Sequence, residues 1–260
     1  MGKIMVITSG KGGVGKTTVT ANVGAALAAM GKRTLLIDTD TGLRNLDMAM
    51  GVEDNVLYDV IDVSEESCSF ENAALPHEKY PNLYILSTSQ TKNKESLSKD
   101  KFVQLCKTLS KRFDFILIDC PAGIEYGFEC ALAPAEEAII VTVPDRAALR
   151  DAERVAGIIE SDYKNICATY LCVNRFIPEL SDKGNAADAI EALFTVAVRL
   201  IGIVPEDPRV MIDAYHGLLS INDRKSQAGR AMRNIAKRLC GEEKKLIEFG
   251  KRRLFKKKYR

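Results

Sequence analysis

The 260-residue sequence predicts an α/β fold, in which a mostly parallel, twisted sheet carries helices on both faces and is followed by a basic amphipathic tail. Two observations lead to this prediction. Short runs rich in β-branched residues alternate with helix-length amphipathic segments, and the strand runs are apolar throughout, as in strands buried on both faces. No repeat, low-complexity tract or long Gly/Ser/Pro linker interrupts the pattern. We therefore expect one domain over residues 1–241 and a tail over residues 242–260.

The expected strands are the apolar, β-branched runs at residues 4–8, 34–37, 83–86, 115–118, 138–143, 169–173 and 198–203. Between them, helix-length amphipathic segments predict helices at residues 17–30, 99–111, 146–161, 186–194 and 226–239. In an open parallel sheet, ligands bind at the carboxyl ends of the strands. We therefore expect the chemistry to lie where each strand stops.

The segment after the first expected strand contains a phosphate-binding pattern. It reads SGKGGVGKTT, and Gly10, Gly15, Lys16 and Thr17 match G-x-x-x-x-G-K-[ST] between a strand and a helix, as the pattern requires. The glycines let backbone N–H groups point at one anion, and the helix adds its positive end. Lys16 is expected on the β- and γ-phosphates, and the Thr17 hydroxyl on Mg²⁺. The residues expected around the nucleotide are Gly10, Lys11, Gly12, Gly13, Val14, Gly15, Lys16, Thr17 and Thr18.

Aspartates stand where two other expected strands end. In FDFILIDCPAG, four apolar residues lead to Asp119, the Walker B pattern, whose carboxylate holds the Mg²⁺ hydration shell near Thr17. In TLLIDTD, Asp38 ends a strand and Asp40 follows two residues later. Both are candidates for the metal shell and for orienting the attacking water, or they cap the next turn. Gly123 would let a backbone N–H approach the γ-phosphate, as a nucleotide-sensing switch does.

A carboxamide ends a further strand, in the stretch YLCVNRF. At this place Asn174 can hydrogen-bond the edge of an adenine base, and asparagine is also a common turn residue. Both interpretations stay open at the level of the sequence.

Composition excludes several classes of protein. Apolar residues make up 46% and charged residues 28% of the chain, which is typical of a soluble globular protein. No run approaches the roughly 18 apolar residues of a membrane span. The N-terminus passes straight from a short strand into the phosphate loop, so no secretory signal is expected. Seven cysteines without a C-x-x-C pair indicate reduced thiols in a cytoplasmic protein and no cysteine-held metal.

Positive charge is concentrated at the C-terminal end. Residues 242–260 carry nine basic and three acidic side chains, a charge of +6, so residues 1–241 carry −4 of the total of +2. On a helical wheel the apolar residues of the tail gather near one face, which predicts a membrane-binding helix. They are Leu246, Ile247, Phe249, Leu254 and Phe255. A solvated basic end or a nucleic-acid arm are the alternatives, and the negative body argues against nucleic acid as a partner.

With its additional Lys11, the loop KGGVGKTT resembles that of the deviant Walker A class of P-loop ATPases, which includes ParA-like partition proteins and the nitrogenase iron protein. Within that class, IDTDTGLRNLDMAMGVEDNVLYD, FILIDCPAGIEYG and GIVPEDPRV resemble the MinD family, over about residues 3–239. The resemblance implies a P-loop NTPase domain that hydrolyses ATP with Mg²⁺. It also implies an ATP-dependent homodimer, in which each Lys11 crosses to the nucleotide of the other subunit.

The same resemblance implies roles for individual residues and partners. Lys11, Lys16 and Asp40 would be catalytic, and Pro205, Glu206 and Asp207 would contact ATP. The implied partners are a MinC-type division inhibitor, a MinE-type or polar-scaffold regulator, and anionic lipid on the cytoplasmic face of the cell membrane. The stretch VPDRAALRDAER keeps the length and charge pattern of a MinD partner-binding helix, but not every residue.

Other members of the class give alternative functions. A ParA-like ATPase would segregate cargo on nucleoid DNA, and a related regulator sets flagellar number. A redox iron protein needs paired cysteines at the dimer interface, and Cys120 and Cys130 are poor candidates because the first lies inside the Walker B stretch. The terminal position of the basic residues favours a membrane over DNA.

Overall fold

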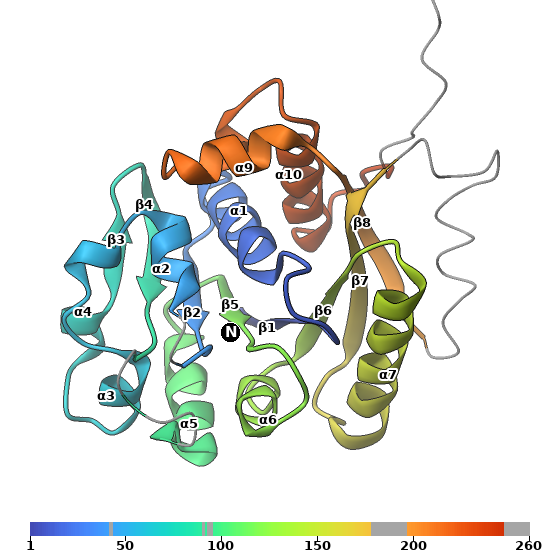
Figure 1. The fold of residues 1–260 in the computed structure, drawn as a ribbon. Helices are drawn as coiled ribbons and strands as arrows, with labels where there is room; N and C mark the ends of the chain where they lie inside the picture. The colour runs from blue at the N-terminus through green and yellow to red at the C-terminus, as the bar shows by residue number, and fades with distance from the viewer. Residues whose placement is uncertain (42–43, 90–91, 93–95, 178–196, 247–260) are drawn as a thin grey trace, which may run out of the picture.

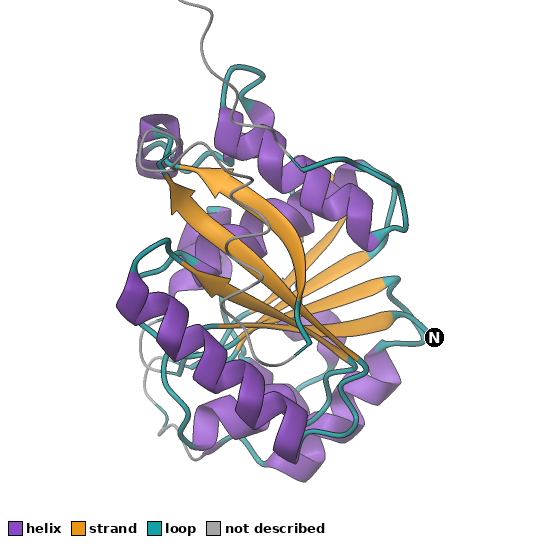
Figure 2. Cartoon of the chain, turned by 90° about the vertical axis from the view of Figure 1, so that its right-hand side faces the viewer, coloured by secondary structure: helices purple, strands orange, loops and turns teal. Residues whose placement is uncertain are grey.

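An eight-stranded sheet forms the centre of the computed structural model, which describes residues 1–41, 44–89, 92, 96–177 and 197–246. The strands are β1 Lys3–Thr8, β2 Thr34–Asp38, β3 Leu75–His77, β4 Tyr80–Leu86, β5 Phe115–Asp119, β6 Glu137–Thr142, β7 Ala168–Phe176 and β8 Arg199–Pro205. Their order is β3-β4-β2-β5-β1-β6-β7-β8, and every neighbouring pair is parallel except β3–β4. The predicted, mostly parallel sheet is confirmed, and Figure 2 shows its twist.

Helices cover both faces of this sheet, as Figure 1 shows. They are α1 Lys16–Ala29, α2 Asn45–Met50, α3 Val60–Ser64, α4 Phe70–Ala73, α5 Lys99–Leu109, α6 Tyr126–Leu132, α7 Arg146–Asp162, α9 Pro208–Tyr215 and α10 Gln227–Leu239, with 3-10 turns η1 Glu53–Asn55 and η4 Ser220–Asn222. On one face α1 and α10 pack side by side, and on the other lie α5, α6 and α7. The neighbouring strands β1 and β5 are followed by helices on opposite faces, α1 after β1 and α6 after β5. The β1–α1 and β5–α6 loops therefore diverge at the carboxyl ends of these strands, where open α/β sheets bind ligands.

Each face of the sheet has its own hydrophobic core. On the α1 face, Leu27 of α1 packs with Leu36 of β2 and Ile235 of α10. On the opposite face, Phe102 of α5 belongs to the same cluster as Ile118 of β5. The central strands β1, β2, β5 and β6 are buried from both sides, which explains why their sequences are largely apolar rather than alternating.

The structure differs from the expected elements mainly where they are short. The sequence analysis did not assign β3, α2, α3, α4, α6 or α9, each of eight residues or fewer, since such runs show too few turns or alternations for a clear period. β3 pairs antiparallel at the edge of the sheet and contains Pro76, which breaks the usual strand pattern. The expected helix at residues 186–194 lies outside the described residues.

Substitution by alanine should have opposite effects on stability at two helical glycines. A Cβ at Gly229 in α10 would lie 2.0 Å from the carbonyl oxygen of Ser220, whereas one at Gly157 in α7 would meet nothing within 4 Å. We expect Gly229→Ala to lower the free energy of unfolding by about 2–3 kcal/mol through overpacking. Gly157→Ala should raise it by about 0.5–1 kcal/mol through helix propensity. Urea unfolding of both variants checks this, and equal effects would contradict it.

Candidate nucleotide-binding site

The expected site residues of three strands meet at one edge of the sheet. Asp38, the last residue of β2, is in register with Asp119, the last residue of β5. Asp119 is in turn in register with Ile7 of β1, just before the phosphate loop. Parallel neighbours thus bring the ends of three segments distant in sequence to one place, as the sequence analysis expected.

The phosphate loop is closed by a short chain of side-chain bonds. The Lys16 Nζ donates to Ser9 Oγ at 3.0 Å, and Ser9 Oγ donates to the Lys11 carbonyl at 2.8 Å. Gly13 and Gly15 have φ values of 75° and 94°, which glycine adopts without strain. Sequence reasoning missed Ser9, although a hydroxyl at the end of a buried apolar strand was an available signal.

Two threonines of α1 bond the Walker B carboxylate. Thr17 Oγ1 donates to Asp119 Oδ2 at 2.7 Å, which confirms that these two residues lie together. Thr20 Oγ1 lies 3.1 Å from Asp119 Oδ1 and is fully buried. Thr20 was not expected, yet its position three residues after Thr17 places both hydroxyls on one face of the helix.

Asp38 and Asp119 form a buried pair of acids. Burial, together with the neighbouring charge of Asp119, raises the pKa of Asp38 well above its ordinary value. Burial likewise raises the pKa of Asp119 to about 6, although the hydrogen bond from Thr17 and the charge of Lys16 act in the other direction. Asp38 also accepts the backbone N–H groups of Asp40 at 2.8 Å and Leu46 at 3.2 Å. It therefore holds the turn after β2, the capping role that the sequence left open.

This donor set fits Mg²⁺. Carboxylate and hydroxyl oxygens are ligands that Mg²⁺ accepts, and a cation would offset the cost of ionising two buried neighbouring acids. Within the described ranges no three His, Cys, Asp or Glu side chains gather into a metal cage. A Mg²⁺ ion here would therefore also take phosphate oxygens and water as ligands.

Three further expected site residues, Asp40, Gly123 and Lys11, lie in the loops that follow β2, β5 and β1. Asp40 is half-buried, and its charge contributes to the raised pKa of both Asp38 and Asp119, behind burial. A cavity of about 20 Å³ lies beside Asp40 and the 121–128 segment, which is enough space for one water. Gly123 has a φ of 97°, and Lys11 is exposed on the rim of the loop.

Asn174 is placed against the phosphate loop. It is 6% exposed, and its Nδ2 donates to the Val14 carbonyl at 2.8 Å. Reading of the adenine edge by Asn174 stays a prediction. The sequence analysis did not expect the bond to the loop.

The 205–207 segment begins at the last residue of β8, Pro205, which is in register with Phe176 at the end of β7. The Glu206 N–H donates to the Phe176 carbonyl at 2.8 Å. Asp207 caps α9 by accepting from the Arg209 N–H at 3.1 Å, and it also accepts from Ser226 Oγ at 2.8 Å. The structure thus gives the Asp207 carboxylate a capping role, and contacts of Pro205, Glu206 and Asp207 with ATP stay predictions.

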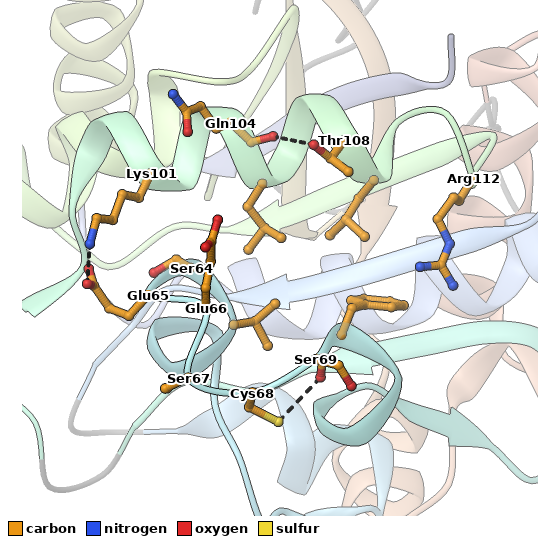
Figure 3. A pocket seen from close by; sticks show the side chains of 14 residues that line it. Ser64, Glu65, Glu66, Ser67, Cys68, Ser69, Lys101, Gln104, Thr108 and Arg112 are labelled. Carbon is orange, nitrogen blue, oxygen red and sulfur yellow. Dashed lines mark hydrogen bonds and ion pairs between the residues drawn. The ribbon is translucent and has the colours of Figure 1, made fainter.

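A larger hollow of about 690 Å³ lies elsewhere, between α5 and the turn after α3 (Figure 3). Its cations are already paired, Lys101 with Glu65 and Arg112 with Glu71, and Arg112 also covers the Phe70 ring. Its described lining contains no glycine-rich loop with a helix N-terminus behind it. The phosphate loop lies instead at the polar carboxyl end of the parallel strands.

The tail is described only at its start. Arg238, near the C-terminal end of α10, donates to the Lys244 carbonyl at 2.8 Å, so the start of the tail contacts this end of the helix. Leu246 is the last described residue, and Ile247, Phe249, Leu254 and Phe255 lie outside the described residues. Among the helices that the structure describes, none combines the length and apolar character needed to cross a membrane.

Comparisons with known proteins find relatives over nearly the whole chain. The family profile described as AAA domain (AAA_31) matches residues 2–169. The septum site-determining protein MinD of Synechocystis sp. is 44% identical over 250 residues, covering 96% of this chain and 93% of that protein. MinD of Bacillus subtilis is 43% identical over 243 residues, covering 93% and 90%.

Solved structures give the same result. The MinC:MinD cell division complex of Aquifex aeolicus matches with a TM-score of 0.86 and 38% identity, over 95% of this chain and 100% of that one. MinD of Pyrococcus horikoshii complexed with Mg-ADP matches with a TM-score of 0.80 and 32% identity, over 92% and 96%. With its phosphate loop, Walker B aspartate and near full-length similarity, the chain belongs to the MinD family of septum site-determining P-loop ATPases.

Proposed function

We propose that this chain is a Mg²⁺-dependent ATPase that dimerises on ATP, attaches to the cytoplasmic face of the cell membrane and positions the inhibition of division, with hydrolysis releasing it. The observation that carries the proposal is the different placement of two lysines in one loop. Lys16 is half-buried and its Nζ donates to Ser9 Oγ, while Lys11 is exposed. One lysine is therefore available to this chain's own phosphates, and the other to a nucleotide across an interface.

The chemistry follows from where positive charge is supplied. A bound Mg²⁺ ion would supply positive charge beside the phosphates. Thr17 and Asp119 would hold it, and Asp40 would orient the attacking water from beside the water-sized cavity. Lys11 of a second subunit would complete the positive surroundings of the transition state. Hydrolysis then depends on dimerisation.

A MinC-type division inhibitor is the proposed protein partner, because the Aquifex relative with the same fold is solved in complex with MinC. A MinE-type peptide or a polar scaffold would regulate the cycle. The tail over residues 242–260 would attach the dimer to anionic lipid, since it holds nine basic side chains beside its apolar ones.

The two lysines should separate binding from turnover. Lys16→Ala should abolish ATP binding, because the loop loses its phosphate-binding charge. Lys11→Ala should bind ATP within a few-fold of the parent, yet lose ATP-dependent dimerisation and slow hydrolysis by about 10² or more, as loss of a charge supplied in trans does. Nucleotide titration with light scattering measures both. Normal dimerisation and turnover of Lys11→Ala would contradict the role in trans.

Asp40 should act on hydrolysis rather than on assembly. Asp40→Ala should accumulate an ATP-bound dimer, because the metal ligands remain while the attacking water is no longer oriented. Asp119→Ala is the matched comparison and should weaken Mg²⁺-dependent binding itself. Single-turnover hydrolysis and gel filtration with ATP test the pair. An Asp40→Ala variant as active as the parent removes this residue from the mechanism.

A single tail should bind lipid weakly, whereas the two tails of one dimer should bind it firmly. Three or four buried apolar side chains contribute about 4–6 kcal/mol, and each basic residue near anionic lipid adds about 1 kcal/mol, before the cost of ordering the helix. Two tails on one dimer act at high effective concentration, which couples attachment to ATP. Deleting residues 246–260 should therefore leave ATP binding intact and abolish sedimentation with anionic vesicles.

A charge-matched pair controls for general electrostatics. Lys251→Gln with Arg252→Gln should weaken vesicle binding by about tenfold or more, since each basic residue contributes about 1 kcal/mol. Lys107→Gln with Lys164→Gln, two exposed lysines of the body, should leave it unchanged. If the truncated chain still sediments with ATP, or the full chain sediments equally with ADP, the tail does not work in this way.

A further inference from the structure

Asn174 contacts the phosphate loop at two consecutive residues. Its carboxamide nitrogen donates to the Val14 carbonyl at 2.8 Å. Because a carbonyl oxygen only accepts hydrogen bonds, the NH₂ group of the Asn174 carboxamide, and not its oxygen, must face the Val14 carbonyl. A Cβ at Gly15 would lie 2.4 Å from the same nitrogen, so this position admits only glycine beside Asn174. The carboxamide is thus packed onto the Val14–Gly15 peptide.

The orientation of this peptide bears directly on phosphate binding. In a planar trans peptide, the carbonyl of Val14 and the N–H of Gly15 point in opposite directions. A carbonyl held toward Asn174 therefore turns the Gly15 N–H away from it. This N–H belongs to the group of loop donors that a phosphate needs, whereas a flipped peptide would present a carbonyl oxygen to the anion.

The end of β7 is irregular where Asn174 lies. Opposite β8, Val173 pairs with Ile203 and Phe176 with Pro205, so β7 contains one extra residue. Arg175 takes a φ of 52°, a left-handed conformation that residues other than glycine rarely adopt. Such bulges re-aim side chains next to functional sites. Asn174 and Phe176 on either side are buried, and the Glu206 N–H bonds the Phe176 carbonyl, which hold the irregular backbone in place.

We infer that Asn174 is a positioning residue of the phosphate loop: it fixes the Val14–Gly15 peptide so that the Gly15 N–H faces the phosphates. The inference rests on the proposed ATP binding at this loop. A contact with adenine would make the effect of Asn174 depend on the base. Positioning of the loop makes it independent of the base.

The test compares three phosphate ligands on the full-length chain, each with Mg²⁺: ATP, GTP and inorganic tripolyphosphate. Asn174→Asp keeps the shape and removes the donor but adds a negative charge that by itself repels phosphate, so Asn174→Ala, which removes the donor without adding charge, is the deciding variant. We expect the dissociation constants of Asn174→Ala for all three ligands to rise by the same factor, about tenfold, the scale of one buried hydrogen bond. Thermal unfolding without ligand reports the folded fraction of both variants.

Asn22 provides a matched control. It is another buried amide on α1, where its Nδ2 donates to the Thr18 carbonyl at 2.9 Å and its oxygen accepts from the Ile221 N–H at 3.1 Å. Asn22→Asp removes the same kind of bond, but from the helix and not from the loop. It should lower the unfolding temperature and leave the three affinities within about twofold.

Three results would overturn the inference: unchanged tripolyphosphate affinity in the Asn174 variants with weakened ATP, no change for any ligand, or an equal loss in Asn22→Asp. The first would assign Asn174 to the base instead. If the parent chain binds none of the three ligands, the proposed ATP binding fails rather than the positioning role.

Discussion

The buried carboxylate of Asp119 is the constraint around which this site is built. An ionised acid in the interior is costly unless it is hydrogen-bonded or paired with a cation. Thr17 and Thr20 supply hydroxyl partners from α1, yet the pKa of the acid stays raised to about 6. The bonds to Asp119 thus tie the phosphate-loop helix to β5, and the remaining electrostatic cost favours a divalent cation at this edge.

The second acid makes that constraint stronger. Asp38 ends the neighbouring strand in register with Asp119, and after burial the charge of Asp119 is the next cause of the raised pKa of Asp38. The Asp38 carboxylate accepts hydrogen bonds from the backbone N–H groups of Asp40 and Leu46, so the turn that contains Asp40 is fixed to the pair of buried acids. A change of charge at the metal site would therefore be felt directly by the residue that we place beside the attacking water.

Much of the fold and the site was predictable from local patterns. The described helices of eleven residues or more were found where expected. The amphipathic period of α5, α7 and α10 is clear, whereas α1 is buried on nearly all sides and was predictable from its position after the phosphate loop. The phosphate loop and Asp119 were predictable because each is a contiguous motif. Short elements such as α2 and β3 were missed because they bury little surface of their own and form only against neighbours.

By itself, the sequence determined the α/β class, the phosphate loop, the Walker B aspartate and the concentration of positive charge in the tail, because each is written in adjacent residues. Only the tertiary structure decided which side chains serve the loop from a distance. Lys16 donates to Ser9, and Thr20 donates to Asp119. Asn174, 160 positions from Val14 in the sequence, donates to the Val14 carbonyl. Such contacts depend on strand order and on a bulge in β7, which no local pattern encodes.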